Sequence, residues 1–176
     1  LRQIFDQADV HTQAAPVCDP QTSADLVAAP ISRPPRTNRD TLRQQIGIPA
    51  HQKVVLITLG GIEGIVAVSQ KLSQVEDLFF IIPGASPTVE RRGNQLLLPH
   101  HSEFYRPDLL HASDAVVGKP GYSTLSEAYA AGIPFIYLPR AHFPEYPLLA
   151  RFIERHIGGF AISTADYELG TWIDRL

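Results

Sequence analysis

The feature that most constrains the fold of this chain is a set of five short apolar runs, which alternate with helix-like segments. They are Lys53–Leu59, Leu78–Ile82, Gln95–Leu98, Asp114–Gly118 and Pro134–Leu138. Strands this apolar are buried on both faces, which is typical of a parallel sheet covered by helices. Right-handed crossovers then build an open, doubly wound sheet. The pattern predicts an α/β fold with a Rossmann-like parallel sheet, which binds ligands at the carboxyl ends of its strands.

The segments between the runs have the spacing and end signals of helices. Asn38 is a suitable N-cap for the first helix, Gly47 and Pro49 end it, and Gly132 ends a later one. The expected helices are Arg39–Ile46, Ile65–Val75, Tyr105–His111, Tyr122–Ala131 and Glu145–His156. A short last strand, Phe160–Ile162, and a mostly helical end, Thr164–Leu176, complete the pattern.

Residues 1–35 differ from the rest of the chain. Five prolines interrupt them, and neither a helical nor a strand period is sustained, although Asp9–Thr12 and Leu26–Ala29 have the character of short strands. We expect residues 1–35 to be a connector, the tail of a preceding N-terminal domain. Residues 36–176 then form the Rossmann-like domain.

Composition excludes several classes of function. With 44% hydrophobic residues and a net charge of −3, the chain is neither disordered nor a basic binder of nucleic acid. No apolar run approaches the roughly 18 residues of a membrane span. The single cysteine, Cys18, excludes an internal disulfide framework and a cysteine-rich zinc site. We expect a cytoplasmic globular protein.

A glycine-rich turn, Gly60-Gly61-Ile62-Glu63-Gly64, follows the first apolar run directly. Glycines let the backbone approach a ligand, and the next helix offers free amides to an anion. The spacing matches neither the dinucleotide fingerprint nor the P-loop. A tight strand-to-helix turn explains the same residues, so both interpretations stand.

The segment Gly118–Ala128 (GKPGYSTLSEA) again leads from a strand through a glycine loop into a helix. The helix amides, the hydroxyls of Ser123 and Thr124, and the Lys119 cation form a suitable set for a diphosphate. One turn further, Glu127 is placed to accept hydrogen bonds from two neighbouring sugar hydroxyls. Thr124 to Glu127 also has the pattern of a capping box, which only fixes the start of a helix.

A third loop, Pro139–Tyr146, carries Arg140, His142 and Glu145 at the same expected edge of the sheet. These are either ligand contacts or ordinary solvated loop residues. No His-x-x-x-His pair, nucleophile elbow or Asp-x-Asp pair is present. The sequence therefore predicts no metal site and no cofactor.

Three stretches resemble the C-terminal, donor-binding domain of GT-B glycosyltransferases, and most closely the family-28-like enzymes, which include the peptidoglycan N-acetylglucosaminyltransferase. They are VVLITLGGIEG, HSEFYRPDLLHASDAVVG and GKPGYSTLSEAYAAGIPFIYLPRAHFPE, and the resemblance covers roughly residues 50–162. A similar domain precedes the kinase part of plant arabinokinase-type proteins.

The resemblance implies roles for residues of each stretch. Glu127 would bind the nucleotide ribose, and Gly121, Tyr122, Ser123 and Thr124 would lie against the diphosphate with Lys119. The remaining positions would be the glycine loop (Gly60, Gly61, Gly64), the base pocket (Phe104, Tyr105) and contacts to phosphate or donor sugar (Arg140, His142, Glu145).

The resemblance further implies an inverting, metal-independent glycosyltransferase that uses a nucleotide sugar, with UDP as the expected nucleotide. The acceptor and the catalytic base would belong to an N-terminal domain, so this chain would bind nucleotide without turning it over. The chain departs from the family where FPEYP replaces a glutamine-containing donor-sugar loop, and Lys119 replaces an arginine. Two alternatives remain: a nucleotide-sugar epimerase or hydrolase of the same fold, and a non-catalytic or regulatory domain fused to another sugar-metabolism enzyme.

Overall fold

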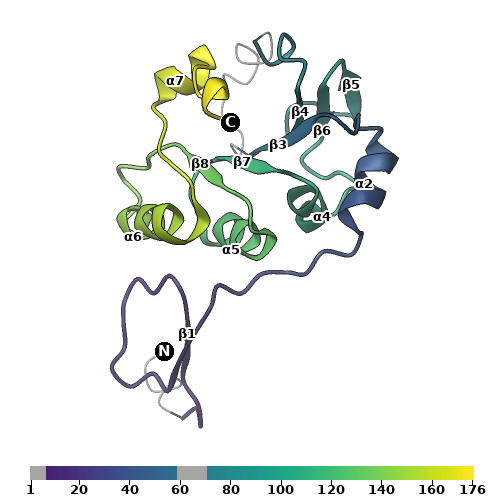
Figure 1. The fold of residues 1–176 in the computed structure, drawn as a ribbon. Helices are drawn as coiled ribbons and strands as arrows, with labels where there is room; N and C mark the ends of the chain where they lie inside the picture. The colour runs from purple at the N-terminus through teal and green to yellow at the C-terminus, as the bar shows by residue number, and fades with distance from the viewer. Residues whose placement is uncertain (1–6, 59–70) are drawn as a thin grey trace.

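A six-stranded sheet forms the centre of the molecule in the computed structural model, which describes residues 7–58 and 71–176 (Figure 1). Its order is β5-β6-β4-β3-β7-β8, and every neighbouring pair is parallel except β5–β6. The strands are β3 (Lys53–Thr58), β4 (Leu78–Pro83), β5 (Glu90–Arg92), β6 (Gln95–Leu98), β7 (Ala115–Gly118) and β8 (Phe135–Tyr137). The predicted α/β fold with a Rossmann-like parallel sheet is confirmed.

Strand order reverses between β3 and β7. From β3 the chain proceeds outward to β4 and β6, and then it returns to the other side of β3 for β7 and β8. Parallel sheets bind ligands outside the carboxyl ends of the strands at such a switch point. Gly118 lies there opposite Thr58, and a Cβ on Gly118 would come within 2.5 Å of the Thr58 carbonyl oxygen. A glycine is therefore required for the close approach of β3 and β7.

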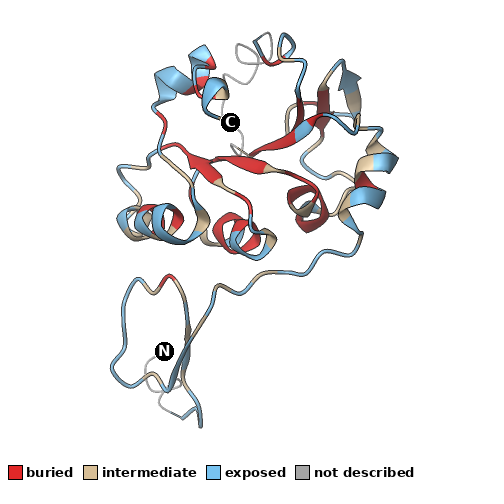
Figure 2. Ribbon diagram, in the orientation of Figure 1, coloured by how far each residue is buried: buried red, intermediate tan, exposed pale blue. Residues whose placement is uncertain are grey.

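Helices cover both faces of the sheet, as predicted (Figure 1). On one face lie α2 (Arg39–Ile46), α4 (Arg106–His111), α5 (Tyr122–Ala131) and α6 (Tyr146–Phe152), and on the other lies α7 (Thr164–Leu169). Strand side chains alternate between two buried clusters: Leu56 packs in the cluster that contains α5, and Ile57 in the cluster of α7. Figure 2 shows the buried central strands; α2 and α7 are largely exposed, whereas most of α4 is buried and the edge strand β5 is not.

The ends of several elements differ from the predictions. Strand β5 was not predicted, because its residues are Glu-Arg-Arg rather than apolar. Instead of the strand expected at Phe160–Ile162, Ala161 forms a single bridge to Tyr137. The helix expected at Glu145–His156 is α6 followed by the π-helical turn η1 (Ile153–Ile157), and the helical end is α7 followed by η2 (Ile173–Arg175). Of the helix expected at Ile65–Val75, residues 65–70 lie outside the described residues, and Lys71 and Leu72 are helical.

The beginning of α5 settles one alternative left by the sequence. Gly121 is the N-cap, Tyr122 is the first helical residue, and no side chain caps this end. Thr124 and Glu127 therefore lie inside the helix, and the predicted capping box is wrong. Helix capping therefore does not explain why a carboxylate lies at position 127.

The N-terminal segment runs outside the helix layer (Figure 1). It contains a small parallel pair, β1 (Thr12–Ala14) with β2 (Leu26–Ala28), so the first short strand lies later than predicted. Residues 32–37, here called the strap, follow this pair and pass along α4. The backbone amides of Arg36 and Thr37 donate to Asp108 Oδ1 at 2.5 and 3.2 Å. The strap is therefore held against α4.

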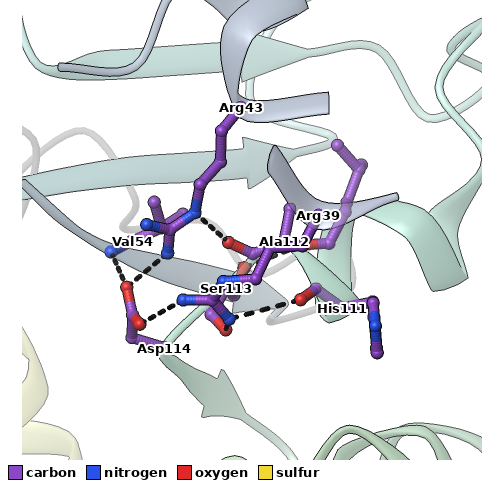
Figure 3. Close-up of polar contacts among 8 residues, drawn as sticks. Arg39, Arg43, Val54, His111, Ala112, Ser113 and Asp114 are labelled. Carbon is purple, nitrogen blue, oxygen red and sulfur yellow. Dashed lines mark hydrogen bonds and ion pairs between the residues drawn. The ribbon is translucent and has the colours of Figure 1, made fainter. Parts of the chain in front are cut away.

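An arginine clamp joins α2 to the turn between α4 and β7 (Figure 3). Asp114 accepts hydrogen bonds from Arg39, from Arg43 at 2.5 Å and from the Val54 amide at 2.6 Å. The same arginines donate to the backbone carbonyls of Ala112 and Ser113, both at 2.8 Å. Burial disfavours the charged form, but the Val54 amide and the two guanidinium groups outweigh it and lower the pKa of Asp114. The clamp fixes the start of β7 beside β3.

Candidate functional site

A cavity of about 370 Å³ opens at the carboxyl ends of β3, β4 and β6. Its wall combines strand ends, the loop that follows β6 and the start of α4. It is lined by Leu56, Thr58, Pro83, Pro99, His100, His101, Ser102, Phe104, Arg106 and Leu109. A cavity of this size, with an aromatic ring, imidazoles and one cation, suits a small polar molecule that carries a flat ring.

Arg106 connects the cavity to the switch point. One of its Nη atoms donates to Thr124 Oγ1 at 2.6 Å and to Thr58 Oγ1 at 3.1 Å. Its Nε lies 3.8 Å from Glu127 Oε2. The side chain is 43% exposed, so a ligand in the cavity can reach the guanidinium. Arg106 thus joins the end of β3, the start of α4 and the first turns of α5.

Glu127 is a buried carboxylate with an unused acceptor. Only 3% of its side chain is exposed, and Oε1 accepts a 2.8 Å hydrogen bond from the strap residue Arg33. Oε2 has no hydrogen-bond partner among the residues that the structure describes. A buried oxygen without a donor carries a desolvation cost that a ligand hydroxyl would offset. This is the residue that the resemblance assigns to the ribose.

Glu127 and Arg106 line different cavities. Glu127 belongs to a smaller one of about 250 Å³ between the strap, α4 and α5, whose other walls include Arg33, Pro107 and His111. Arg106 lines the larger cavity and contacts the Glu127 carboxylate from that side. Arg106 therefore stands between the larger cavity and Glu127.

Other predicted residues near the starts of α4 and α5 point in different directions. Phe104 lines the larger cavity, but the Tyr105 ring faces the strap, where Arg36 lies 3.9 Å from its centroid. The Tyr122 hydroxyl points to the N-terminal segment: it donates to the Pro16 carbonyl at 2.5 Å and lies 2.9 Å from Cys18 Sγ. Burial, together with the Cys18 contact, raises the pKa of Tyr122. Neither Tyr105 nor Tyr122 is directed at the larger cavity.

Within the described part of the chain, no side-chain hydrogen bond or ion pair joins the remaining predicted residues to Arg106 or Glu127. Lys119, Ser123 and His142 are exposed. Arg140 donates to the Pro120 carbonyl at 3.3 Å and lies over the Phe143 ring, while Glu145 is the half-buried N-cap residue of α6. Gly60, Gly61 and Gly64 lie outside the described residues. The roles expected of these eight residues therefore remain predictions.

Two arginines that contact Glu127, namely Arg106 and Arg33, were not among the residues predicted from the sequence. Arg106 follows directly after the predicted Phe104 and Tyr105, and its place at the start of a helix beyond a strand was the signal available. Arg33 lies in the segment interpreted as a connector, 94 residues from Glu127, and no local pattern indicates their contact.

Between residues 7 and 58 and beyond residue 70, no helix is long and apolar enough to cross a membrane, and no cluster of three potential ligand side chains is arranged for a metal ion.

Sequence comparison finds relatives of the chain, although no family model matches it. It is 30% identical over 156 residues to L-arabinokinase of Arabidopsis thaliana, across 88% of this chain and 15% of that protein. It is 28% identical over 124 residues to the UDP-N-acetylglucosamine–N-acetylmuramyl-(pentapeptide) pyrophosphoryl-undecaprenol N-acetylglucosamine transferase of Desulforudis audaxviator, across 58% and 32%. The chain thus spans less than half the length of either relative.

Comparison with solved structures shows the fold. Spinosyn forosaminyltransferase SpnP matches with a TM-score of 0.60 and 14% identity, over 93% of this chain and 46% of that one. Spinosyn rhamnosyltransferase SpnG complexed with thymidine diphosphate matches with a TM-score of 0.52 and 15% identity, over 80% and 39%. The resemblance inferred from the sequence motifs is confirmed. The chain is a relative of the family-28-like glycosyltransferases and has the fold of a GT-B C-terminal domain.

Proposed function

We propose that this chain binds the nucleotide-sugar donor of an inverting, metal-independent glycosyltransferase, with a UDP-sugar as the first candidate. The observation that carries the proposal is the buried Glu127 carboxylate, whose Oε2 has no hydrogen-bond partner among the described residues. A 2′,3′-diol supplies the donors that this oxygen lacks. The relation to a transferase named for UDP-N-acetylglucosamine supports a UDP donor.

The surroundings of Glu127 fit the rest of a nucleoside diphosphate. The larger cavity has a ring, Phe104, that would pack against a base. The amino end of α5, with Gly121 as N-cap, offers backbone amides and a positive dipole end to the phosphates. Base, ribose and phosphates would then be bound by three adjacent elements, α4, α5 and the loop after β6.

The chemistry requires charge stabilisation on the leaving diphosphate. In glycosyl transfer the bond between the anomeric carbon and the phosphate oxygen breaks, and negative charge develops on the diphosphate. A helix amino end and a guanidinium placed beforehand stabilise that charge. The acceptor oxygen forms the new bond to the anomeric carbon and loses its proton to a general base, which we place in an N-terminal domain. The whole enzyme's transfer activity is part of this proposal.

A second function is favoured by one comparison. L-arabinokinase contains a region similar to this chain in only 15% of its length, so this type of domain also occurs within a sugar kinase. In that setting it would bind a nucleotide sugar without transferring the sugar. Both functions require nucleotide binding, but only the first requires transfer.

Calorimetric titration of the chain with UDP, GDP, ADP and dTDP, without and with Mg²⁺, tests the proposal. We expect one nucleotide to bind in the absence of Mg²⁺, with an affinity that Mg²⁺ does not increase. Absence of binding by a folded chain would refute donor binding, and binding only with Mg²⁺ would refute metal independence. Transfer from the corresponding nucleotide sugar by the full-length protein would then separate the two functions.

A further inference from the structure

We propose that Arg106, rather than the predicted Lys119, is the cation that binds the diphosphate of the donor. The inference rests on the proposed function, because it concerns the same nucleotide site. It assigns a ligand-binding role to a residue that the sequence motifs leave out.

The position of Arg106 is the first argument. Its guanidinium contacts Thr124 in the first turn of α5 and Thr58 at the end of β3, and it also lines the larger cavity. A phosphate at the amino end of α5 would therefore meet the helix amides, the Thr124 hydroxyl and this guanidinium together. No other cation lines the larger cavity, as far as the described residues show.

The neutral partners of Arg106 are the second argument. Its close contacts are two hydroxyls, and the Glu127 carboxylate lies further away, at 3.8 Å from Nε. A guanidinium held mainly by hydroxyls retains its preference for an anion, and two parallel hydrogen bonds to phosphate are stronger than bonds to neutral oxygens. If the Arg106 guanidinium exchanged the Thr58 and Thr124 hydroxyls for a phosphate, it would also move away from Glu127 Oε2 and leave that oxygen open to the ribose. Arg106 would thus link diphosphate binding to ribose binding.

The alternative cations are placed less well. Lys119 is exposed and does not line the larger cavity. Arg140 is engaged with the Pro120 carbonyl and the Phe143 ring. Both lie on loops, whereas Arg106 is the first residue of a helix and is joined to two other elements. A cation fixed in place before binding stabilises an anion more effectively than one that must be ordered.

Arg106→Gln tests this assignment in a series of ligands. For the base that binds best, nucleoside, nucleoside monophosphate and nucleoside diphosphate are titrated into the 176-residue chain and its variant. We expect the variant to bind the diphosphate about 10- to 100-fold more weakly, as fits the loss of charge-assisted hydrogen bonds. The nucleoside should lose less than about threefold. Arg106→Lys should recover part of the loss, because it restores the charge without the planar fork.

Three comparisons complete the test. Arg151→Gln removes an exposed helical arginine whose hydrogen bond goes to Pro147 of its own helix, and it should bind all three ligands as the wild type does. If Arg106→Gln lost equal affinity for the nucleoside and the diphosphate, or if Lys119→Gln lost more affinity for the diphosphate than Arg106→Gln, the assignment of Arg106 would be wrong. The proposed function would not be affected by either result. If the wild-type chain binds no nucleotide, the proposed function and this inference both fall.

Discussion

Replacement of Glu127 by glutamine separates a binding role from a structural one. The substitution keeps the shape of the side chain, removes the negative charge and replaces one acceptor oxygen by an amide donor. In the wild type, one oxygen accepts from Arg33 at 2.8 Å and the other has no partner among the described residues. If the free oxygen receives a ribose hydroxyl, the variant loses a charge-assisted hydrogen bond to the ligand.

The two expected effects differ in size. A hydrogen bond to a charged acceptor contributes about 1.5–3 kcal/mol, which corresponds to a dissociation constant raised about 10- to 150-fold. The loss of stability should be small, because Arg33 is 57% exposed and an ion pair with an exposed partner contributes at most about 1 kcal/mol. The variant also removes the cost of burying an incompletely paired charge, and this offsets part of the lost ion-pair energy. We therefore expect the melting temperature to change by less than about 4 °C.

Calorimetry and thermal unfolding of the same preparations measure both effects. Glu168→Gln, at an exposed position of α7, is the matched control and should change neither. The wild type should also prefer a ribonucleotide to its 2′-deoxy form, and Glu127→Gln should lose most of that preference. A variant that binds like the wild type would refute the ribose assignment. A variant that binds weakly only because it is largely unfolded would show that Glu127 is structural.

Three further predictions concern the scaffold of the site. Asp114→Asn should lower the free energy of unfolding by about 2 kcal/mol at neutral pH, since it weakens charge-assisted hydrogen bonds. Because the folded protein lowers the pKa of Asp114 from 3.8, the stability difference between variant and wild type should shrink as the pH falls below about 4. Urea unfolding at a series of pH values measures this. Gly118→Ala should cost about 1–3 kcal/mol in urea unfolding, because its Cβ would lie 2.5 Å from the Thr58 carbonyl oxygen. Gly121→Ala has open space around its Cβ and should cost less, about 0.5–1 kcal/mol, since alanine is a poorer N-cap than glycine. Tyr167→Phe should raise the melting temperature by about 2–4 °C, since the buried Tyr167 hydroxyl has no partner within the described part of the chain; an unchanged or lower value would contradict this.

The sheet could be predicted from the sequence because burial on both faces makes each central strand continuously apolar. The five parallel strands were all found, and so was the helix end at Gly132. Strand β5 could not be found, because it lies at the edge, pairs antiparallel and consists of charged residues. The π-helical turn after α6 has no local signal of its own, since its residues continue the helical period.

The candidate site could be predicted only where it depends on local order in the chain. Thr124 and Glu127 follow a strand and a glycine loop, so their place at the start of α5 is visible in the sequence. Their contacts with Arg106 and Arg33 depend on how α4 and the strap pack on α5, and these partners are 18 and 94 residues away. The helix begins at Tyr122, as predicted, so Thr124 lies inside it rather than at its N-cap, and the capping-box interpretation is wrong. Side-chain direction could not be predicted either, as Tyr105 shows by facing the strap.

A crystal structure of the chain with the nucleoside diphosphate that calorimetry ranks tightest tests the central claim most directly. We expect the base in the cavity beside Phe104, a ribose hydroxyl within hydrogen-bond distance of Glu127 Oε2, and the diphosphate between Arg106 and the amino end of α5. A nucleotide bound elsewhere, or a ribose turned away from a Glu127 that keeps its present contacts, would contradict the account.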